Sequence, residues 1–121
     1  MERVPFRVTQ AAKAYDQIEK LPVSLLLDNI RSMYNVGSFF RTADGAGIES
    51  LYLSGITARP PKSAITKTAL GAEDSVLWHP SDNAIETVDT LRTRGYEIAA
   101  IETAVTAVDL YDWQPKWPVL L

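Results

Sequence analysis

A short apolar run at residues 23–27 passes directly into a polar stretch at residues 29–44, and this junction constrains the fold more than any other feature. The polar stretch holds two asparagines, two arginines and one glycine. A short apolar run followed by turn residues is typical of a buried strand, so a strand is predicted over residues 23–28. A strand, a polar turn and a helix in succession are where α/β proteins place functional groups, because the turn lies at the carboxyl end of the strand.

The same pattern recurs along the chain. Gly45 and Gly47 are expected to end the helix after the junction, Pro60 and Pro61 require a loop, and Gly95 is expected to end a later helix. Repeated strand–helix units favour parallel pairing with right-handed crossovers, so the fold class is an α/β, Rossmann-like parallel sheet. Helices are predicted at residues 11–20 and at about 36–46, and a third helix, capped by Asp82 or Asn83, is predicted to run to residue 94. Further strands are predicted at residues 51–54, 75–78 and 96–101. Residues 63–70 stay ambiguous between a loop and a short helical turn.

Size and composition narrow the class of protein. A chain of 121 residues is one domain or less. It has no cysteine, which excludes disulfides and thiolate metal sites, and its single histidine, His79, is expected to be a loop residue, so no metal is expected. No apolar run approaches the ~20 residues that span a membrane, and the first residues have no secretory pattern. A cytoplasmic protein without membrane attachment is therefore expected.

Charge is unevenly distributed along the chain. The formal net charge is −3. Residues 31–67 nevertheless carry five basic and two acidic side chains, whereas residues 73–121 carry nine acidic and three basic ones. The basic part contains the junction, so a polyanion is expected to dock there. A randomly uneven surface is the alternative explanation.

The pattern N-x-R-S-x-x-N-V-G-S-x-x-R-T-A, from Asn29 to Ala43, resembles the first conserved motif of the SpoU (TrmH-like) RNA ribose methyltransferases, of the knotted SPOUT class. A second block, Lys67 to Asp74, resembles the K-T/S-x-x-G-A-E/L feature of the same family. The resemblance implies 2′-O-ribose methylation of tRNA or rRNA, S-adenosyl-L-methionine as cofactor, a homodimer and an α/β knot fold.

The resemblance also implies a domain division. Residues 1–22 are expected to be a helical N-terminal extension, and residues 23–121 the N-terminal portion of the methyltransferase domain. Two later family motifs have no counterpart here, so the knot and most of the donor pocket are expected beyond Leu121, and the 121 residues alone are expected to be inactive. The apolar end, residues 117–121, is read as the start of a truncated strand or, alternatively, as a terminal strand docked at a sheet edge.

Two residues are the catalytic candidates. In similar enzymes the arginine that matches Arg41 acts at the ribose 2′-hydroxyl, and the asparagine that matches Asn35 holds it. Six residues apart on one helix, the two side chains would point about 240° apart. They are therefore expected to meet only if Asn35 lies before the helix, in the turn or at the N-cap. Gly37 is expected to let a phosphate or ribose approach the backbone.

Other candidates follow from the same resemblance. Asn29, Arg31 and Ser32 are expected to shape the turn and touch RNA phosphate, although plain turn chemistry explains Asn29 and Ser32 equally well. Lys67 is a candidate phosphate ligand, or else a solvated charge. Glu102 and Thr103, at the end of the predicted strand 96–101, are candidates for the donor pocket.

Two other functions remain as alternatives. A non-catalytic RNA-binding module of the same fold would bind RNA in a salt-dependent manner and would lack affinity for the methyl donor. A Rossmann-like nucleotide enzyme is disfavoured, because neither G-x-G-x-x-G nor G-x-x-x-x-G-K-[ST] occurs in the sequence.

Overall fold

The structure, a computed structural model, describes residues 19–121. The helix predicted at residues 11–20 falls almost wholly outside this range, as does most of the predicted N-terminal extension.

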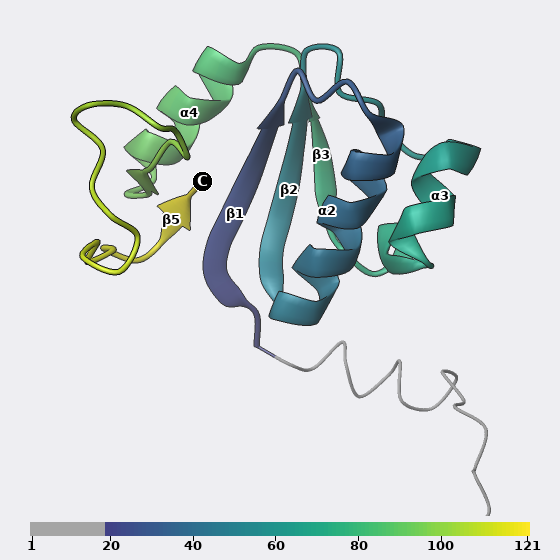
Figure 1. Cartoon of the computed structure of the whole chain (residues 1–121), viewed down its shortest axis with the longest axis horizontal. Helices are drawn as coiled ribbons and strands as arrows, with labels where there is room; N and C mark the ends of the chain where they lie inside the picture. The colour runs from purple at the N-terminus through teal and green to yellow at the C-terminus, as the bar shows by residue number, and fades with distance from the viewer. Residues whose placement is uncertain (1–18) are drawn as a thin grey trace, which may run out of the picture.

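Five strands form one sheet in which every pair is parallel, as the sequence predicted. The order is β3-β2-β1-β5-β4. Figure 1 shows helices α2 and α3 on one face of the sheet and α4 on the other. The strands are β1 (Leu21–Asp28), β2 (Ile48–Ser54), β3 (Trp78–Ser81), β4 (Glu97–Ile98) and β5 (Val119–Leu120).

The last strand lies inside the sheet. Val119 of β5 pairs with Val23 of β1 on one side and with Glu97 of β4 on the other. Val119 and Leu120 are both buried, because neighbouring strands and helices cover them. The alternative of a terminal strand docked at a sheet edge is therefore wrong.

Helix α2 (Met33–Ala46) follows β1 and starts earlier than predicted. Ser32 is its N-cap, with its hydroxyl oxygen accepting a hydrogen bond from the Asn35 amide at 3.1 Å. This cap satisfies an amide that has no partner within the helix, and the helix can therefore begin at Met33. At the other end Gly47 adopts φ 72°, a left-handed conformation that glycine adopts without steric cost, whereas Gly45 lies within the helix.

The segment left ambiguous by the sequence is a helix, α3 (Ser63–Ala69), which packs beside α2. A short 3₁₀ turn, η1 (Ala72–Asp74), follows and displaces the next strand. Strand β3 therefore begins at Trp78, so the strand predicted at residues 75–78 was placed too early. His79 consequently lies in a strand and stacks on Tyr52 of β2, with 5.0 Å between ring centroids, so its prediction as a loop residue was wrong.

Helix α4 (Ala84–Thr93) is capped by Asn83 and followed by Gly95 at φ 92°, as predicted. Its apolar stripe is only partly used: Leu91 is buried, but Ile85 is 71% exposed. Strand β4 is much shorter than the predicted strand 96–101, because β5 offers it only two paired residues.

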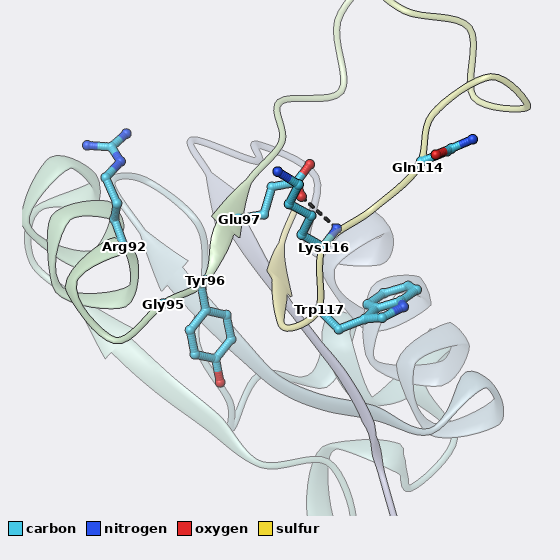
Figure 2. Close-up of a pocket in the computed structure, with 7 residues that line it drawn as sticks. All are labelled: Arg92, Gly95, Tyr96, Glu97, Gln114, Lys116 and Trp117. Atoms are coloured by element: carbon cyan, nitrogen blue, oxygen red, sulfur yellow. Dashed lines mark hydrogen bonds between the residues drawn. The ribbon is translucent and has the colours of Figure 1, made fainter.

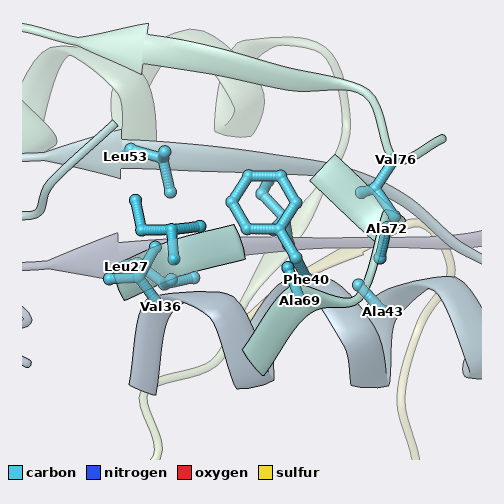
Figure 3. Packing of buried hydrophobic residues seen from close by; sticks show 10 residues of the cluster. Leu27, Val36, Phe40, Ala43, Leu53, Ala69, Ala72 and Val76 are labelled. Atoms are coloured by element: carbon cyan, nitrogen blue, oxygen red, sulfur yellow. The ribbon is translucent and has the colours of Figure 1, made fainter. Parts of the chain in front are cut away.

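The core lies between the sheet and the pair α2 and α3, as Figure 3 shows. Phe40 of α2 fills its centre and is fully buried. The remaining buried members come from β1, β2, α2, α3 and the segment after it: Leu27, Val36, Ala43, Leu51, Leu53, Ile65, Ala69, Ala72 and Val76. This packing fixes α2 against the carboxyl ends of β1 and β2, where the candidate residues gather.

Candidate functional site

The turn between β1 and α2 is held by the side chain of Asn29. Asn29 adopts φ 55°, a left-handed conformation that asparagine tolerates better than most residues. Its Oδ1 accepts a hydrogen bond from the Ile56 amide at 3.0 Å. A Cβ on Gly55 would lie 1.9 Å from that oxygen, so glycine is required there. Asn29 thus performs the turn chemistry that was one of its two interpretations.

Thr57 joins the ends of β1 and β2, and sequence reasoning missed it. Its buried hydroxyl donates to the Leu27 carbonyl at 2.9 Å and accepts from the Ile30 amide at 3.0 Å. Beside it, the Ser54 hydroxyl donates to Asp28 Oδ1 at 2.8 Å. A threonine in a predicted loop gave no signal of this role, because its partners lie about 30 residues earlier, on the other strand.

Asn35 and Arg41 do not meet as the sequence predicted. Both lie within α2, because the N-cap is Ser32 and not Asn35. Six residues at 100° each separate their side chains by about 240° around the helix, which is about 120° in the shorter direction. Among the hydrogen bonds of residues 19–121, none joins the two side chains. Both side chains are exposed, so each is available to a ligand separately.

Gly37 serves helix packing. It is buried against α3, and a Cβ at this position would lie 1.9 Å from Thr68 Oγ1 and 2.4 Å from the Ile65 carbonyl oxygen. The expected approach of a phosphate or ribose to Gly37 is therefore wrong, because α3 occupies that space.

Helices α2 and α3 form one continuous surface. The Thr68 hydroxyl, in the last turn of α3, donates to the Tyr34 carbonyl, in the first turn of α2, at 2.7 Å. This hydrogen bond ties the two helices together. Lys67, the residue before Thr68, is exposed. We call the exposed cations here the basic surface: Arg31, Arg41, Lys62 and Lys67. Within the described part of the chain, none of the four forms a salt bridge.

An apolar groove of about 460 Å³ opens at the carboxyl ends of β1, β5 and β4. Its walls include Phe39 of α2, Val88 of α4 and Ile98 of β4. Asp28 is the one lining residue with an ionisable side chain. The groove has the size and apolar lining of a small-molecule site, and it lies where parallel α/β sheets bind ligands.

Glu102 and Thr103 are not part of this groove. Strand β4 ends at Ile98, and both residues lie in the exposed segment that follows, although Ile101 still lines the groove. Their polar groups bond mainly to each other: Glu102 Oε1 accepts from the Thr103 amide at 2.8 Å. The prediction that they end a strand was wrong, since the strand has no paired residues beyond Ile98.

A second hollow, of about 430 Å³, lies at the opposite edge of the sheet, where β4 begins (Figure 2). Its central carboxylate is engaged by its own chain: Glu97 accepts from Trp113 Nε1 at 3.0 Å and from the Lys116 amide at 2.6 Å. The indole hydrogen bond, followed by that of the amide, lowers the pKa of Glu97. The hydrogen bonds of Glu97 thus hold the long β4–β5 connection in place, and this carboxylate is not free to bind a ligand.

Tyr96, beside Glu97, is engaged in the same way. Its hydroxyl lies 3.0 Å from each carboxylate oxygen of Glu49. Burial, then this contact with a negative charge, raises the pKa of Tyr96, so the hydroxyl stays protonated and donates.

Residues 19–121 contain neither a membrane-spanning helix nor a cluster of metal ligands. No helix in this range combines the length and the apolar character that crossing a bilayer requires. No group of three or more metal-binding side chains gathers there.

Comparisons with known proteins agree on one family. Residues 22–121 match the model of the SpoU rRNA Methylase family. The chain is 30% identical over 114 residues to the 23S rRNA (guanosine-2′-O-)-methyltransferase RlmB of Burkholderia sp., covering 89% of this chain and 46% of the relative. It is 28% identical over 103 residues to a TrmH-family tRNA/rRNA methyltransferase of Staphylococcus haemolyticus, covering 85% and 41%. The chain thus spans less than half the length of these curated relatives.

Solved structures share the fold. The A. aeolicus TrmH/SpoU tRNA modifying enzyme superposes with a TM-score of 0.76 at 21% identity, covering 93% of this chain and 57% of the other. The AdoMet-bound rRNA methyltransferase of Sinorhizobium meliloti gives a TM-score of 0.72 at 24% identity, covering 84% and 39%. With a family model matching nearly all of its described residues, and with the parallel fold that these methyltransferases share, the chain belongs to the SpoU family of RNA methylases.

Proposed function

We propose that this chain carries the RNA-facing part of an enzyme that methylates a ribose 2′-hydroxyl in tRNA or rRNA, with S-adenosyl-L-methionine as methyl donor. The observation that carries the proposal is Arg41. Its side chain lies exposed on α2, within the first family motif, and has no acidic partner within residues 19–121. The RlmB relative, named for 2′-O-methylation of guanosine, supports the ribose as the site of transfer.

Arg41 acts by charge and position. A guanidinium is a poor base, because it is a cation with five N–H donors and no acceptor. It can hold the ribose and stabilise the negative charge that develops on the 2′-oxygen during transfer. The proton then leaves to another group, for which a phosphate of the RNA is a candidate. The basic surface around Arg41 supplies the attraction for the RNA backbone.

The apolar groove fits the body of the methyl donor. S-adenosyl-L-methionine supplies an electrophilic methyl group when bound. Phe39, Ile98 and Leu120 offer apolar surface to it, in a groove of about 460 Å³. Among the lining residues only Asp28 has an ionisable side chain that could bind the polar ends of the donor. Its carboxylate already accepts a hydrogen bond from the Ser54 hydroxyl.

The positions of Arg41 and the groove support a homodimer. Phe39 lines the groove, and Arg41, two residues further along α2, points about 160° away from it around the helix. Arg41 therefore faces away from the groove of its own chain. A site that combines Arg41 of one copy with the groove of a second copy removes this conflict.

Product analysis tests the proposal. The 121-residue chain, and in parallel the protein as its native gene expresses it, is incubated with tRNA, rRNA and methyl-tritiated donor, and the RNA is digested to nucleosides. We expect the protein as its native gene expresses it to place label in 2′-O-methyl nucleosides, and the 121 residues alone to give none. Label in base-methylated nucleosides alone would contradict ribose methylation.

A non-catalytic RNA-binding module is the second candidate. The scarcity of polar side chains in the groove favours it, because the donor has several polar groups to satisfy. This candidate predicts RNA affinity that falls with salt, and no binding of the donor in calorimetry even by the protein as its native gene expresses it. Donor binding at micromolar concentration would exclude it.

A further inference from the structure

Tyr34 shares a face of α2 with Arg41. The two residues are seven apart, which brings their side chains within about 20° of each other around the helix and about 10 Å apart along it. Ser38 lies between them on the same face. Tyr34 is 52% exposed although it belongs to a well-packed helix.

The backbone of Tyr34 is held firmly, whereas its ring forms no aromatic stack or hydrogen bond within residues 19–121. Its carbonyl oxygen accepts hydrogen bonds from Thr68 Oγ1 at 2.7 Å and from Ser38 Oγ at 3.1 Å. Gly37 keeps α3 in close contact with α2 just beyond it. The ring, in contrast, stacks on no other aromatic ring, and its hydroxyl has no hydrogen-bond partner in the described part of the chain.

The surroundings of Tyr34 are basic. Arg31 precedes it by three residues, and Lys67 is the neighbour of the threonine that holds its carbonyl. An exposed aromatic ring among free cations is the combination that binds single-stranded nucleic acid, because cations attract the backbone and bases stack on the ring. A tyrosine also loses little conformational entropy on binding, since it has two χ angles.

We propose that Tyr34 stacks on an unpaired base of the bound RNA, next to the ribose that Arg41 contacts. The proposal rests on the proposed function for the role of Arg41. Tyr34 is then a positioning residue: it fixes the nucleotide beside the reacting one, and so places the ribose at Arg41. Stacking also requires that base to be unpaired, so loops and single strands are preferred over duplexes.

The test measures binding of a short single-stranded RNA to the full 121-residue chain by fluorescence anisotropy. The variants are Tyr34→Leu, which keeps apolar bulk but removes the ring, and Tyr34→Phe, which keeps the ring. Tyr111→Leu is the matched control, because Tyr111 is 94% exposed in the β4–β5 connection. Circular dichroism checks that each variant is folded.

We expect Tyr34→Leu to weaken binding about 5- to 150-fold, the range found when one base-stacking side chain is removed. Tyr34→Phe and Tyr111→Leu should stay within about twofold of the unmodified chain. The unmodified chain should bind an RNA with one abasic nucleotide more weakly than the intact RNA. The Tyr34→Leu variant should bind both RNAs equally. A merely structural role of Tyr34 would not produce this difference between the two chains.

Three results would overturn the stacking role. If Tyr34→Leu binds RNA as the unmodified chain does, while Arg41→Ala binds more weakly, the stacking role fails and the proposed function stands. If the unmodified chain binds no RNA, both fail together. Equal losses in Tyr34→Leu and Tyr34→Phe would also exclude stacking, because the hydroxyl would then be the contact.

Discussion

The two hollows of the molecule lie at opposite ends of the strands of one sheet, which we call the amino edge and the carboxyl edge. They differ in what their polar groups do. At the amino edge, Glu97 and Tyr96 are hydrogen-bonded within the chain, to Trp113 and Glu49 respectively. At the carboxyl edge the groove is lined by apolar residues, with Asp28 as its one ionisable side chain. Arg41 and Lys67 lie outside the groove, exposed on α2 and α3, and form no salt bridge within residues 19–121. Hollows of similar volume therefore have different uses: the amino edge holds the chain together, whereas the carboxyl edge offers apolar surface, and the free positive charge lies on the helices outside the groove.

The largest expected effect is at Arg41. Replacing Arg41 with alanine should lower the methyl-transfer rate by at least roughly 10²–10³-fold, the usual cost of removing one group that stabilises a developing oxyanion. Lysine at this position keeps the charge and should retain part of the activity. Rates are measured with tritiated donor on the protein as its native gene expresses it, and unfolding curves should coincide, because Arg41 is exposed.

Arg92→Ala is the matched control for that variant, since Arg92 is an exposed arginine at the amino-edge hollow. It should leave methyl transfer unchanged. A near-normal rate for Arg41→Ala, or an equal loss for Arg92→Ala, would break the contrast between the two edges.

Gly37→Ala tests the packing that carries the basic surface. The new methyl group would lie 2.4 Å from the Ile65 carbonyl oxygen. This is a backbone atom, so the clash cannot be relieved by rotating a side chain. We expect the free energy of unfolding to fall by about 1–3 kcal/mol, as overpacking usually costs. Urea denaturation measures this. Gly45→Ala in the same helix meets nothing within 4 Å and should not destabilise the protein. Equal stability of both variants would contradict the close contact between α2 and α3.

Ser32→Ala tests the cap at the start of α2. Ser32 accepts the Asn35 amide at 3.1 Å, and loss of an N-cap costs about 1 kcal/mol of stability. Ser32→Asn should restore the cap without adding charge, and thermal unfolding distinguishes the two variants. If RNA affinity fell in Ser32→Asn while stability was restored, Ser32 would be a phosphate ligand as well as a cap.

The smallest effect concerns acid at the amino edge. The folded-state pKa of Glu97 is lowered from 4.5, so its stabilisation is complete above about pH 4.5 and is lost as the pH falls through the lowered folded value. The protection of the β4–β5 connection from hydrogen exchange, measured relative to the intrinsic exchange rate at each pH, should therefore fall in this acid range. Glu97→Gln should remove the pH dependence of this protection, and unchanged protection in the unmodified chain would show that Glu97 does not hold this connection.

Several features were predictable because they depend on local sequence. Asn83 and Gly95 mark the ends of α4 as expected, since capping and left-handed turns need specific residue types at specific places. The parallel pairing followed from alternating strands and helices. The strand ends were less predictable: β4 stops at Ile98 because its pairing depends on β5, about twenty residues later in the chain.

The candidate site divides in the same way. The sequence alone predicted that the turn after β1 holds the polar residues and that Arg41 lies on the helix that follows, because both depend on neighbouring residues. The sides of α2 to which Asn35 and Arg41 point are also set locally, by the Ser32 cap, although that cap was not predicted. Only the tertiary packing placed Gly37 against α3 and β5 inside the sheet. These features depend on which distant segments pack together, and local periodicity carries no information about that.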